Sequence, residues 1–180
     1  MNVCVFCGSS TGADAVYADS AHETGRLLAN AGHSLIYGGG NIGLMGIIAD
    51  SVLQAGGRVI GVIPDFLMNR EVGHKGLTEL IVVQSMHERK KRMADLADVF
   101  IALPGGWGTL DELAEILTWR QLGLIDQPVG LLNVSSYFTP LVNQMKAMSE
   151  AGFLHPSNLK FLTVENSPSK LLTTLGVVTV

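Results

Sequence analysis

Short apolar runs alternate with amphipathic stretches of helical length from one end of the sequence to the other. The runs are rich in leucine and β-branched residues and are nearly continuous, which is typical of strands covered on both faces. A strict alternation of such strands with helices favours an α/β fold, with a doubly wound parallel sheet, right-handed crossovers and helices on both faces. We expect strands at 3–6, 34–37, 58–63, 79–83, 99–103 and 129–132. We expect helices at 13–31, 43–56, 86–97, 109–122 and 137–151, and a last one that starts at Ser167.

The chain has 180 residues, of which 47% are apolar and 16% are charged. This length suits a single domain over 1–180, and the composition excludes a disordered chain, a charged coiled coil and a collagen-like repeat. The mean hydropathy of +0.33 is high for so small a chain, which suggests that a second copy covers part of the surface. The net charge of −4 leaves no basic surface for a nucleic-acid backbone, so we expect no nucleic-acid partner.

The longest stretch without Asp, Glu, Lys or Arg, from Leu27 to Ala49, contains several polar residues and six glycines. It is therefore interpreted as a helix end, a strand and a glycine-rich loop, and not as a membrane span. The first residues, MNVCVF, have the pattern of a strand and not that of a signal peptide. Cys4 and Cys7 cannot complete a zinc site by themselves, so no metal is expected. Because Cys4 lies inside the first strand, buried thiols in a reducing cytosol are favoured over a disulfide switch, and we expect a cytoplasmic protein without a membrane partner.

Turns of glycine and other small residues follow three of the expected strands, at 7–10, 38–43 and 104–109. The carboxyl ends of parallel strands share one edge of a sheet, so bare backbone amides and helix N-termini gather there, an arrangement that holds a phosphate. A single such turn is often only a tight connection. The 38–43 turn also fits the G-x-G-x-x-G fingerprint of dinucleotide sites, but it follows the second strand, and its ribose-binding acid would have to be Asp65. No P-loop sequence is present.

The helix expected after the last glycine-rich turn opens with Thr-Leu-Asp-Glu, which also has the form of a capping box. In that alternative Glu112 folds back on the Thr109 amide and has a structural role. Three glycines directly before the helix favour a ligand site, because they let a ligand approach the backbone closely. Glu112 and Glu115 share a face of this helix that is distinct from its core face. The basic cluster 86–92 is either a solvated face or the source of the opposite charge at the same edge.

Five segments, in order along the chain, resemble the Lonely Guy proteins, cytokinin riboside 5′-monophosphate phosphoribohydrolases that are often mislabelled lysine decarboxylases. The segments are CGSS at 7–10, YGGGNIGLMG at 37–46, MHERK at 86–90, PGGWGTLDE at 104–112 and TWRQLG at 118–123. The resemblance covers essentially the whole chain, with Asp111 where many members carry Glu. It implies a Rossmann-like fold and a homodimer with active sites near the subunit interface. It also implies hydrolysis of the N-glycosidic bond of adenosine-type monophosphates to the base and ribose 5-phosphate, with no cofactor.

The resemblance assigns the catalytic pair to Arg89 and Glu112. In that reading Glu112 binds ribose hydroxyls, stabilises positive charge on the sugar and orients water, while Arg89 polarises the departing purine or holds the carboxylate. Glu115 either supports this pair from outside the site or is a solvated helix acid. The resemblance and the glycine-rich edge together give the expected nucleotide contacts: Gly8, Ser9, Gly39, Gly40, Glu71, Lys90, Gly105, Gly106, Trp107, Gly108, Thr109, Leu110, Asp111 and Thr118.

Two other functions fit the same residues. A non-catalytic carrier of a nucleotide or of molybdenum cofactor shares this type of fold and phosphate-binding edge, but a carrier does not require Arg89 to be paired with Glu112. A general AMP nucleosidase would act without preference for modified adenines, and the motifs do not separate it from a cytokinin-specific enzyme. A pyridoxal-dependent decarboxylase is not favoured, because no lysine of the chain stands in the setting of a Schiff-base lysine.

Overall fold

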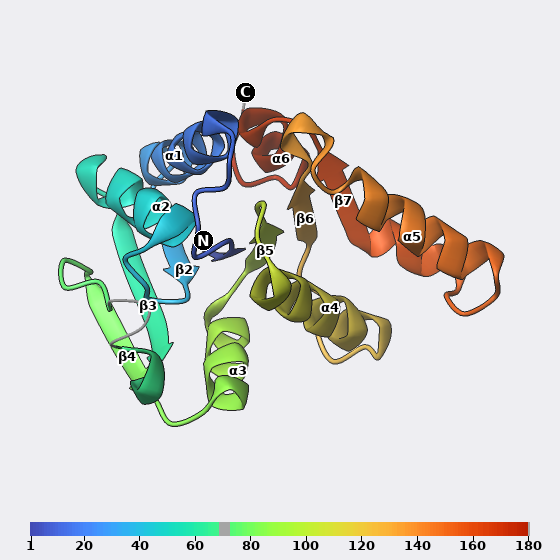
Figure 1. Cartoon of the computed structure of the whole chain (residues 1–180), viewed down its shortest axis with the longest axis horizontal. Helices are drawn as coiled ribbons and strands as arrows, with labels where there is room; N and C mark the ends of the chain where they lie inside the picture. The colour runs from blue at the N-terminus through green and yellow to red at the C-terminus, as the bar shows by residue number, and fades with distance from the viewer. Residues whose placement is uncertain (69–72, 180) are drawn as a thin grey trace.

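A parallel sheet of seven strands, in the order β4-β3-β2-β1-β5-β6-β7, forms the centre of the computed structural model, which describes residues 1–68 and 73–179 (Figure 1). The strands are β1 (Asn2–Phe6), β2 (Ser34–Tyr37), β3 (Arg58–Pro64), β4 (Glu79–Val83), β5 (Val99–Ala102), β6 (Val129–Leu132) and β7 (Leu162–Glu165). The helices are α1 (Ala15–Asn30), α2 (Gly43–Gln54), α3 (Met86–Leu96), α4 (Trp107–Gln121), α5 (Thr139–Glu150) and α6 (Pro168–Thr174). Three short 3-10 turns are η1 (Asp65–Leu67), η2 (Val134–Ser136) and η3 (Pro156–Phe161).

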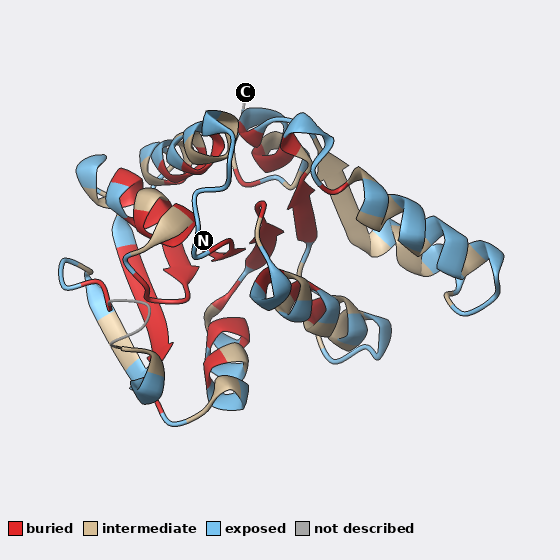
Figure 2. Ribbon diagram, viewed as in Figure 1, coloured by how far each residue is buried: buried red, intermediate tan, exposed pale blue. Residues whose placement is uncertain are grey.

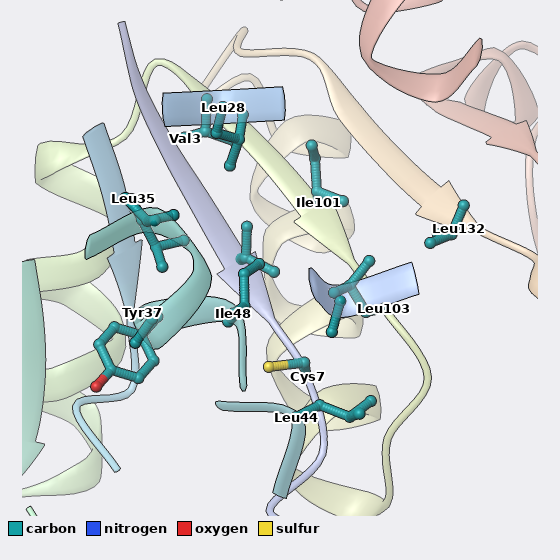
Figure 3. Packing of buried hydrophobic residues seen from close by; sticks show 14 of the residues in the cluster. Val3, Cys7, Leu28, Leu35, Tyr37, Leu44, Ile48, Ile101, Leu103 and Leu132 are labelled. Atoms are coloured by element: carbon teal, nitrogen blue, oxygen red, sulfur yellow. The ribbon is translucent and has the colours of Figure 1, made fainter. Parts of the chain in front are cut away.

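Helices cover both faces of the sheet, and each face has its own hydrophobic cluster. On one face α1, α2 and α6 pack over a cluster that includes Leu28, Leu35 and Ile48, seen from close by in Figure 3. On the other face α3, α4 and the start of α5 pack over a cluster that includes Met93 and Phe100. The central strands are accordingly buried along their length (Figure 2). Burying each large side chain contributes about 1.5–3 kcal/mol, and burial from both sides explains why the apolar runs are continuous. The predicted α/β fold class is confirmed.

The structure adds one strand to the six that the sequence predicted. The residues of β7, Leu-Thr-Val-Glu, lie at the edge of the sheet and are only half-buried. Polar residues alternate with apolar ones in this strand, so it lacks the continuous apolar run on which the prediction depended. Three helix starts were also wrong, and the first helix, α1, begins at Ala15 and not at 13. The helix α4 begins at Trp107 and not at 109, and α5 begins at Thr139 and not at 137, because η2 precedes it.

The strand order reverses at β1, which lies between β2 and β5. The chain moves outward from β1 to β4 and then returns to the other side of β1, where Phe6 pairs with Ala102. In open parallel sheets, ligands bind outside the carboxyl ends of the strands at such a reversal. The turns after β1 and β5 meet here, since the Gly8 amide donates to the Pro104 carbonyl over 3.0 Å.

Two further features bear on the predictions from sequence. Cys4 and Cys7 are both free and buried, which confirms buried thiols in place of a disulfide. Within the described part of the chain, no helix has both the length and the apolar composition that crossing a membrane requires.

Candidate functional site

A cavity of about 210 Å³ opens at the reversal of strand order. Phe6 at the end of β1 and Cys7 just after it contribute to the lining, together with the turns after β1 and β2 and the first turns of α3 and α4. This is the edge at which the glycine-rich turns were expected to meet. The predicted site residues that line the cavity are Gly8, Ser9, Arg89, Gly106, Trp107, Gly108, Thr109 and Glu112.

The N-terminus of α4 opens directly onto this cavity. Its N-cap is Gly106, which has no side chain to cap the helix, and the first intrahelical bond of the backbone runs from the Leu110 amide to the Gly106 carbonyl. The amides of the first turn therefore have no partner within the helix, and they carry the positive end of the helix dipole. The helix α3 differs, because its N-cap Ser85 accepts a hydrogen bond from the Glu88 amide over 3.1 Å.

Thr109 lies within the first turn of α4 and is not its N-cap, so the capping-box alternative for Thr109 and Glu112 is wrong. The Thr109 side chain is buried and folds back over the preceding turn. A Cβ atom at Gly105 would lie 2.0 Å from the Thr109 hydroxyl oxygen, so only glycine fits at 105. The Pro-Gly-Gly-x-Gly-Thr motif is therefore a packing unit, in which Gly105 leaves room for the threonine side chain in the first turn of the helix.

Arg89, on the first turn of α3, is 4% exposed. Its Nε donates to the Val62 carbonyl over 3.1 Å and its Nη2 donates to the Gly38 carbonyl over 2.8 Å. A Cβ atom at Gly38 would lie 1.9 Å from Nη2, so the guanidinium occupies the space that this glycine leaves open. The carbonyls come from β3 and from the turn after β2, and they hold a permanent positive charge in the wall of the cavity.

Glu112 faces the same cavity from the second turn of α4. Both Glu112 and Arg89 lie close enough to Cys7 to act on its ionisation. Burial raises the pKa of the Cys7 thiol far above its usual range, the Glu112 carboxylate raises it further, and the Arg89 guanidinium lowers it. The cavity thus brings together a cation, a carboxylate and a helix N-terminus, as the sequence predicted for this edge.

Lys90 turns away from the cavity lining and joins α3 to α4. Its ammonium donates to Asp111 over 3.1 Å and lies 3.2 Å from a carboxylate oxygen of Glu115. Burial by itself would lower the pKa of Lys90, but the hydrogen bonds with Asp111 and Glu115 outweigh that effect and raise it. Three residues singled out from the sequence therefore form one charged cluster beside the cavity.

Gly39 and Gly40 lie behind the cavity, among residues that fix the turn after β2. The Gly39 carbonyl accepts a hydrogen bond from the His74 amide over 3.0 Å, and Gly40 forms an antiparallel bridge with Gly73. The returning chain is anchored by the His74 ring, whose Nε2 lies 3.0 Å from a carboxylate oxygen of Asp50. In the described structure these two glycines are part of a turn that is held by its neighbours.

The remaining predicted contacts lie at other places. Gly105 lines a second cavity, together with residues of the turn after β1. Leu110 packs against the hydrophobic cluster under α4. Thr118 lines an apolar groove between α4 and α5, two turns of helix beyond Glu112 and Asp111. Glu71 lies outside the residues that the structure describes.

Several cavity residues were not among the predicted contacts. Met45 and Met86 lie inside segments that carried the family resemblance, but an apolar side chain usually indicates core and not a site. Leu67 belongs to η1, in the long connection between β3 and β4, where no motif pointed to it. These three side chains add an apolar wall to the cavity, beside its polar helix end.

A family model described as possible lysine decarboxylase matches residues 45–175. A probable cytokinin riboside 5′-monophosphate phosphoribohydrolase of Oryza sativa subsp. japonica is 47% identical over 170 residues, which cover 94% of this chain and 70% of that protein. A cytokinin riboside 5′-monophosphate phosphoribohydrolase of Arabidopsis thaliana is also 47% identical over 170 residues, covering 94% and 80% of the two chains.

Solved structures with the same fold include carriers of molybdenum cofactor. The molybdenum cofactor binding protein of Rippkaea orientalis superposes with a TM-score of 0.72 at 23% identity, covering 97% of this chain and 93% of that one. The molybdenum cofactor carrier protein of Chlamydomonas reinhardtii gives a TM-score of 0.73 at 20% identity, covering 97% and 95%. At this level of identity the likeness concerns the fold alone, whereas the curated relatives match in sequence over most of their length.

Proposed function

Because the chain belongs to the Lonely Guy family of cytokinin riboside 5′-monophosphate phosphoribohydrolases, we propose that it hydrolyses the N-glycosidic bond of adenine-type nucleoside 5′-monophosphates. The products are the free base and ribose 5-phosphate, and the substrates are cytokinin riboside monophosphates, AMP or both. One observation carries the proposal: an uncapped helix N-terminus, a buried guanidinium and a carboxylate line the same cavity. Each of these groups suits a different part of the substrate.

The 5′-phosphate binds at the N-terminus of α4. The amides of Gly106, Gly108 and Thr109 belong to the uncapped first turn, where free N–H groups and the helix dipole attract an anion. Gly8 and Ser9 line the cavity from the turn after β1 and complete the phosphate site. Trp107 is 88% exposed at the mouth, so its indole is available to cover a bound nucleotide. Backbone amides alone hold the phosphate in this scheme.

Glu112 and Arg89 act on the glycosidic bond. When the bond between the anomeric carbon and the purine nitrogen breaks, its electron pair goes to the base and positive charge develops on the ribose. The Glu112 carboxylate stabilises that charge and orients the water that attacks the anomeric carbon, and the proton that this water loses balances the proton that the departing base takes up. Arg89 is fixed by two backbone carbonyls, and its permanent charge either polarises the departing purine or holds Glu112 in place.

The other predicted contacts have supporting roles in this proposal. Lys90 holds Asp111 and Glu115, and thereby fixes α4 against α3, which sets Glu112 relative to Arg89. Gly39 and Gly40 give the turn after β2 the shape that Arg89 needs, and Gly105 and Leu110 seat the first turn of α4. Glu71 remains a predicted contact from the connection between β3 and β4.

Lysine decarboxylation is a poorer fit to these residues. A lysine that forms an imine must be deprotonated readily, so its environment must lower its pKa. Lys90, the lysine next to the cavity, has carboxylates on both sides that raise its pKa instead. A carrier fits less well than a hydrolase because the relatives that match over most of the chain are phosphoribohydrolases by name.

We also propose that the protein is a homodimer. The helix α5 has no fully buried residue and stands at the rim of the fold (Figure 2). Between it and α4 runs an apolar groove of about 370 Å³ that includes Leu117, Leu141 and Met145. Phe153, at the end of this region, is 87% exposed. Burial of this surface in a homodimer would also give Thr118 a place near a subunit interface. Sedimentation equilibrium distinguishes this dimer from a monomer.

The proposal extends to the whole chain and to its compartment. All seven strands share one sheet, so residues 1–180 act as one catalytic domain. Cys4 and Cys7 are free thiols, which suits a reducing cytoplasm.

Product analysis tests the proposed function directly. The purified protein is incubated with AMP and with isopentenyladenosine monophosphate, and the products are separated by chromatography. Free base with ribose 5-phosphate is the expected result, and the ratio of the two rates identifies the preferred base. Bound but unchanged nucleotide would instead favour a carrier.

The Glu112→Gln variant tests the catalytic assignment. Losing one electrostatic group of this kind costs about 100- to 1000-fold in kcat, with the fold intact by circular dichroism. The Glu23→Gln variant removes a carboxylate from α1, on the opposite face of the sheet, and should keep normal turnover. Normal turnover by Glu112→Gln would refute the assignment.

A further inference from the structure

The turn after β6 has an unusual backbone. Ser135 and Ser136 both adopt the left-handed conformation, with φ of 49° and 59°, although neither is glycine. Two consecutive residues of this kind cost stability, and such strain persists only where the surroundings impose it. Asn133 imposes it here. Its Oδ1 accepts from the Phe138 amide over 2.7 Å, and its Nδ2 donates to the Thr139 hydroxyl over 3.0 Å. This strained turn sets the position of Tyr137, the residue that directly follows it.

Tyr137 reaches from this turn to the glycine-rich turn after β5. Its hydroxyl donates to the Gly105 carbonyl over 2.6 Å, although 32 residues separate the two in sequence. Its ring makes edge-to-face contacts with Tyr17, at 5.6 Å between centroids, and with Phe138, at 4.8 Å. The aromatic contacts hold the ring, and the short hydrogen bond holds the carbonyl.

Tyr17 and Tyr137 brace the two turns that flank the proposed phosphate site. The Tyr17 ring packs against the turn after β1, where a Cβ atom at Gly12 would lie 2.7 Å from it. Both rings line a second cavity of about 290 Å³, which adjoins the first. Gly8, Ser9 and Gly106 line both cavities, so the two cavities are neighbours.

Because a peptide bond is planar, the hydrogen bond to the Gly105 carbonyl also fixes the direction of the Gly106 N–H. The Gly105 carbonyl and the Gly106 N–H belong to one planar trans unit and point in opposite directions. A hydroxyl that holds the carbonyl beside the second cavity, which Gly105 lines, therefore turns the N–H away from Tyr137, and Gly106 is the residue of this unit that also lines the first cavity. A hydrogen bond to the carbonyl also polarises the unit and makes its N–H a better donor.

We propose that Tyr137 is a positioning residue, whose hydroxyl orients the Gly105–Gly106 peptide so that the Gly106 amide faces the 5′-phosphate. The inference rests on the proposed function for the identity of the anion. It adds a residue outside the motifs that carried the family resemblance. The strained turn at Ser135 and Ser136 thus helps to hold the Gly106 amide in its binding orientation before the phosphate arrives.

The Tyr137→Phe variant removes only the hydroxyl and keeps both ring contacts. We expect the dissociation constant for ribose 5-phosphate, measured by calorimetry, to rise about three- to tenfold, as for the loss of one neutral hydrogen bond. The KM for AMP should rise by a similar factor, with a smaller change in kcat. The dissociation constant for adenine and the thermal midpoint should stay close to those of the original protein.

Thr174→Val is the matched control, because it removes another hydroxyl that donates to a backbone carbonyl, that of Lys170 over 2.9 Å, in α6 and away from both cavities. It should bind ribose 5-phosphate normally. The proposal is overturned if Tyr137→Phe binds ribose 5-phosphate as the original protein does, or if its affinities for ribose 5-phosphate and adenine fall together. Binding of ribose 5-phosphate is measured without turnover, so absence of hydrolysis would refute the proposed function and leave this test valid.

Discussion

Replacing Gly38 with alanine tests whether activity requires the fixed position of the Arg89 guanidinium. The new Cβ would lie 1.9 Å from Nη2 of the guanidinium, whereas atoms of this kind rest about 3.5 Å apart. The guanidinium or the end of β2 must therefore move by roughly 1.5 Å. Nη2 then loses its 2.8 Å bond to the Gly38 carbonyl, and Nε loses alignment with the Val62 carbonyl.

The expected effect follows from these two bonds. Hydrogen bonds to a charged group contribute about 1.5–3 kcal/mol each, so the free energy of unfolding should fall by roughly 3 kcal/mol. Misplacing a catalytic group by 1 Å can cost about 100-fold, so kcat/KM for AMP should fall at least that far. Chemical denaturation and product chromatography measure the two quantities on the same preparation.

Gly130→Ala is the control for this experiment. A Cβ atom at Gly130 would lie 2.6 Å from a Leu175 methyl group, a comparable clash in β6 beside α6. This variant should lose about 1–3 kcal/mol of stability and keep its kcat/KM. The reasoning fails if Gly38→Ala stays within threefold of the original activity, or if Gly130→Ala loses activity to the same degree.

Two further predictions concern ionisable groups. Lys90→Met should lower the free energy of unfolding by about 1 kcal/mol through the loss of the pairs with Asp111 and Glu115. Because folding raises the pKa of Lys90, this contribution is complete below the unfolded value of about 10.4 and disappears as pH rises through the higher folded value. Urea titrations of both proteins between pH 7 and 11 check it, and a difference that grows above pH 10 would contradict it. Burial raises the pKa values of Cys4 and Cys7, so neither thiol should react with Ellman's reagent at pH 8 until the protein unfolds, when both should react. Rapid labelling of a thiol in the native protein would disprove this.

The alternation of apolar runs and helical stretches was enough to predict the fold, because in a doubly wound sheet almost every apolar run is a strand buried from both sides. The exception was β7, which lies at the edge of the sheet and is half-buried. The pattern reports apolar composition and not hydrogen bonding, so β4 at the opposite edge stands out through its run Leu-Ile-Val-Val although it is also poorly covered, whereas Leu-Thr-Val-Glu in β7 does not. The glycine-rich turns likewise marked the correct edge, because the carboxyl ends of parallel strands always meet there.

The detail of the site was harder to predict. The cluster 86–92 contains four basic residues, and its pattern does not by itself say which one turns inward. Arg89 lies one helical turn before Met93, which is buried, so its position on the core face was visible. An arginine on such a face is normally taken as exposed. What allows its burial is a pair of carbonyls, at Val62 and Gly38, that are 27 and 51 residues away in sequence.

The charges of the proposed site are arranged along α4. Its N-terminus carries about half a positive charge, and Glu112 follows Gly106 by about 9 Å along the axis. Helical side chains point back toward the N-terminus, so the carboxylate lies closer to the bound anion than its backbone does. A phosphate held at the helix end thus places the attached ribose beside Glu112. The helix end offsets only part of the phosphate's charge of about −2 before positive charge develops on the sugar. The chain as a whole carries a net charge of −4, so the attraction of this site for an anion is local. It depends on the N-terminus of α4, which opens onto the cavity.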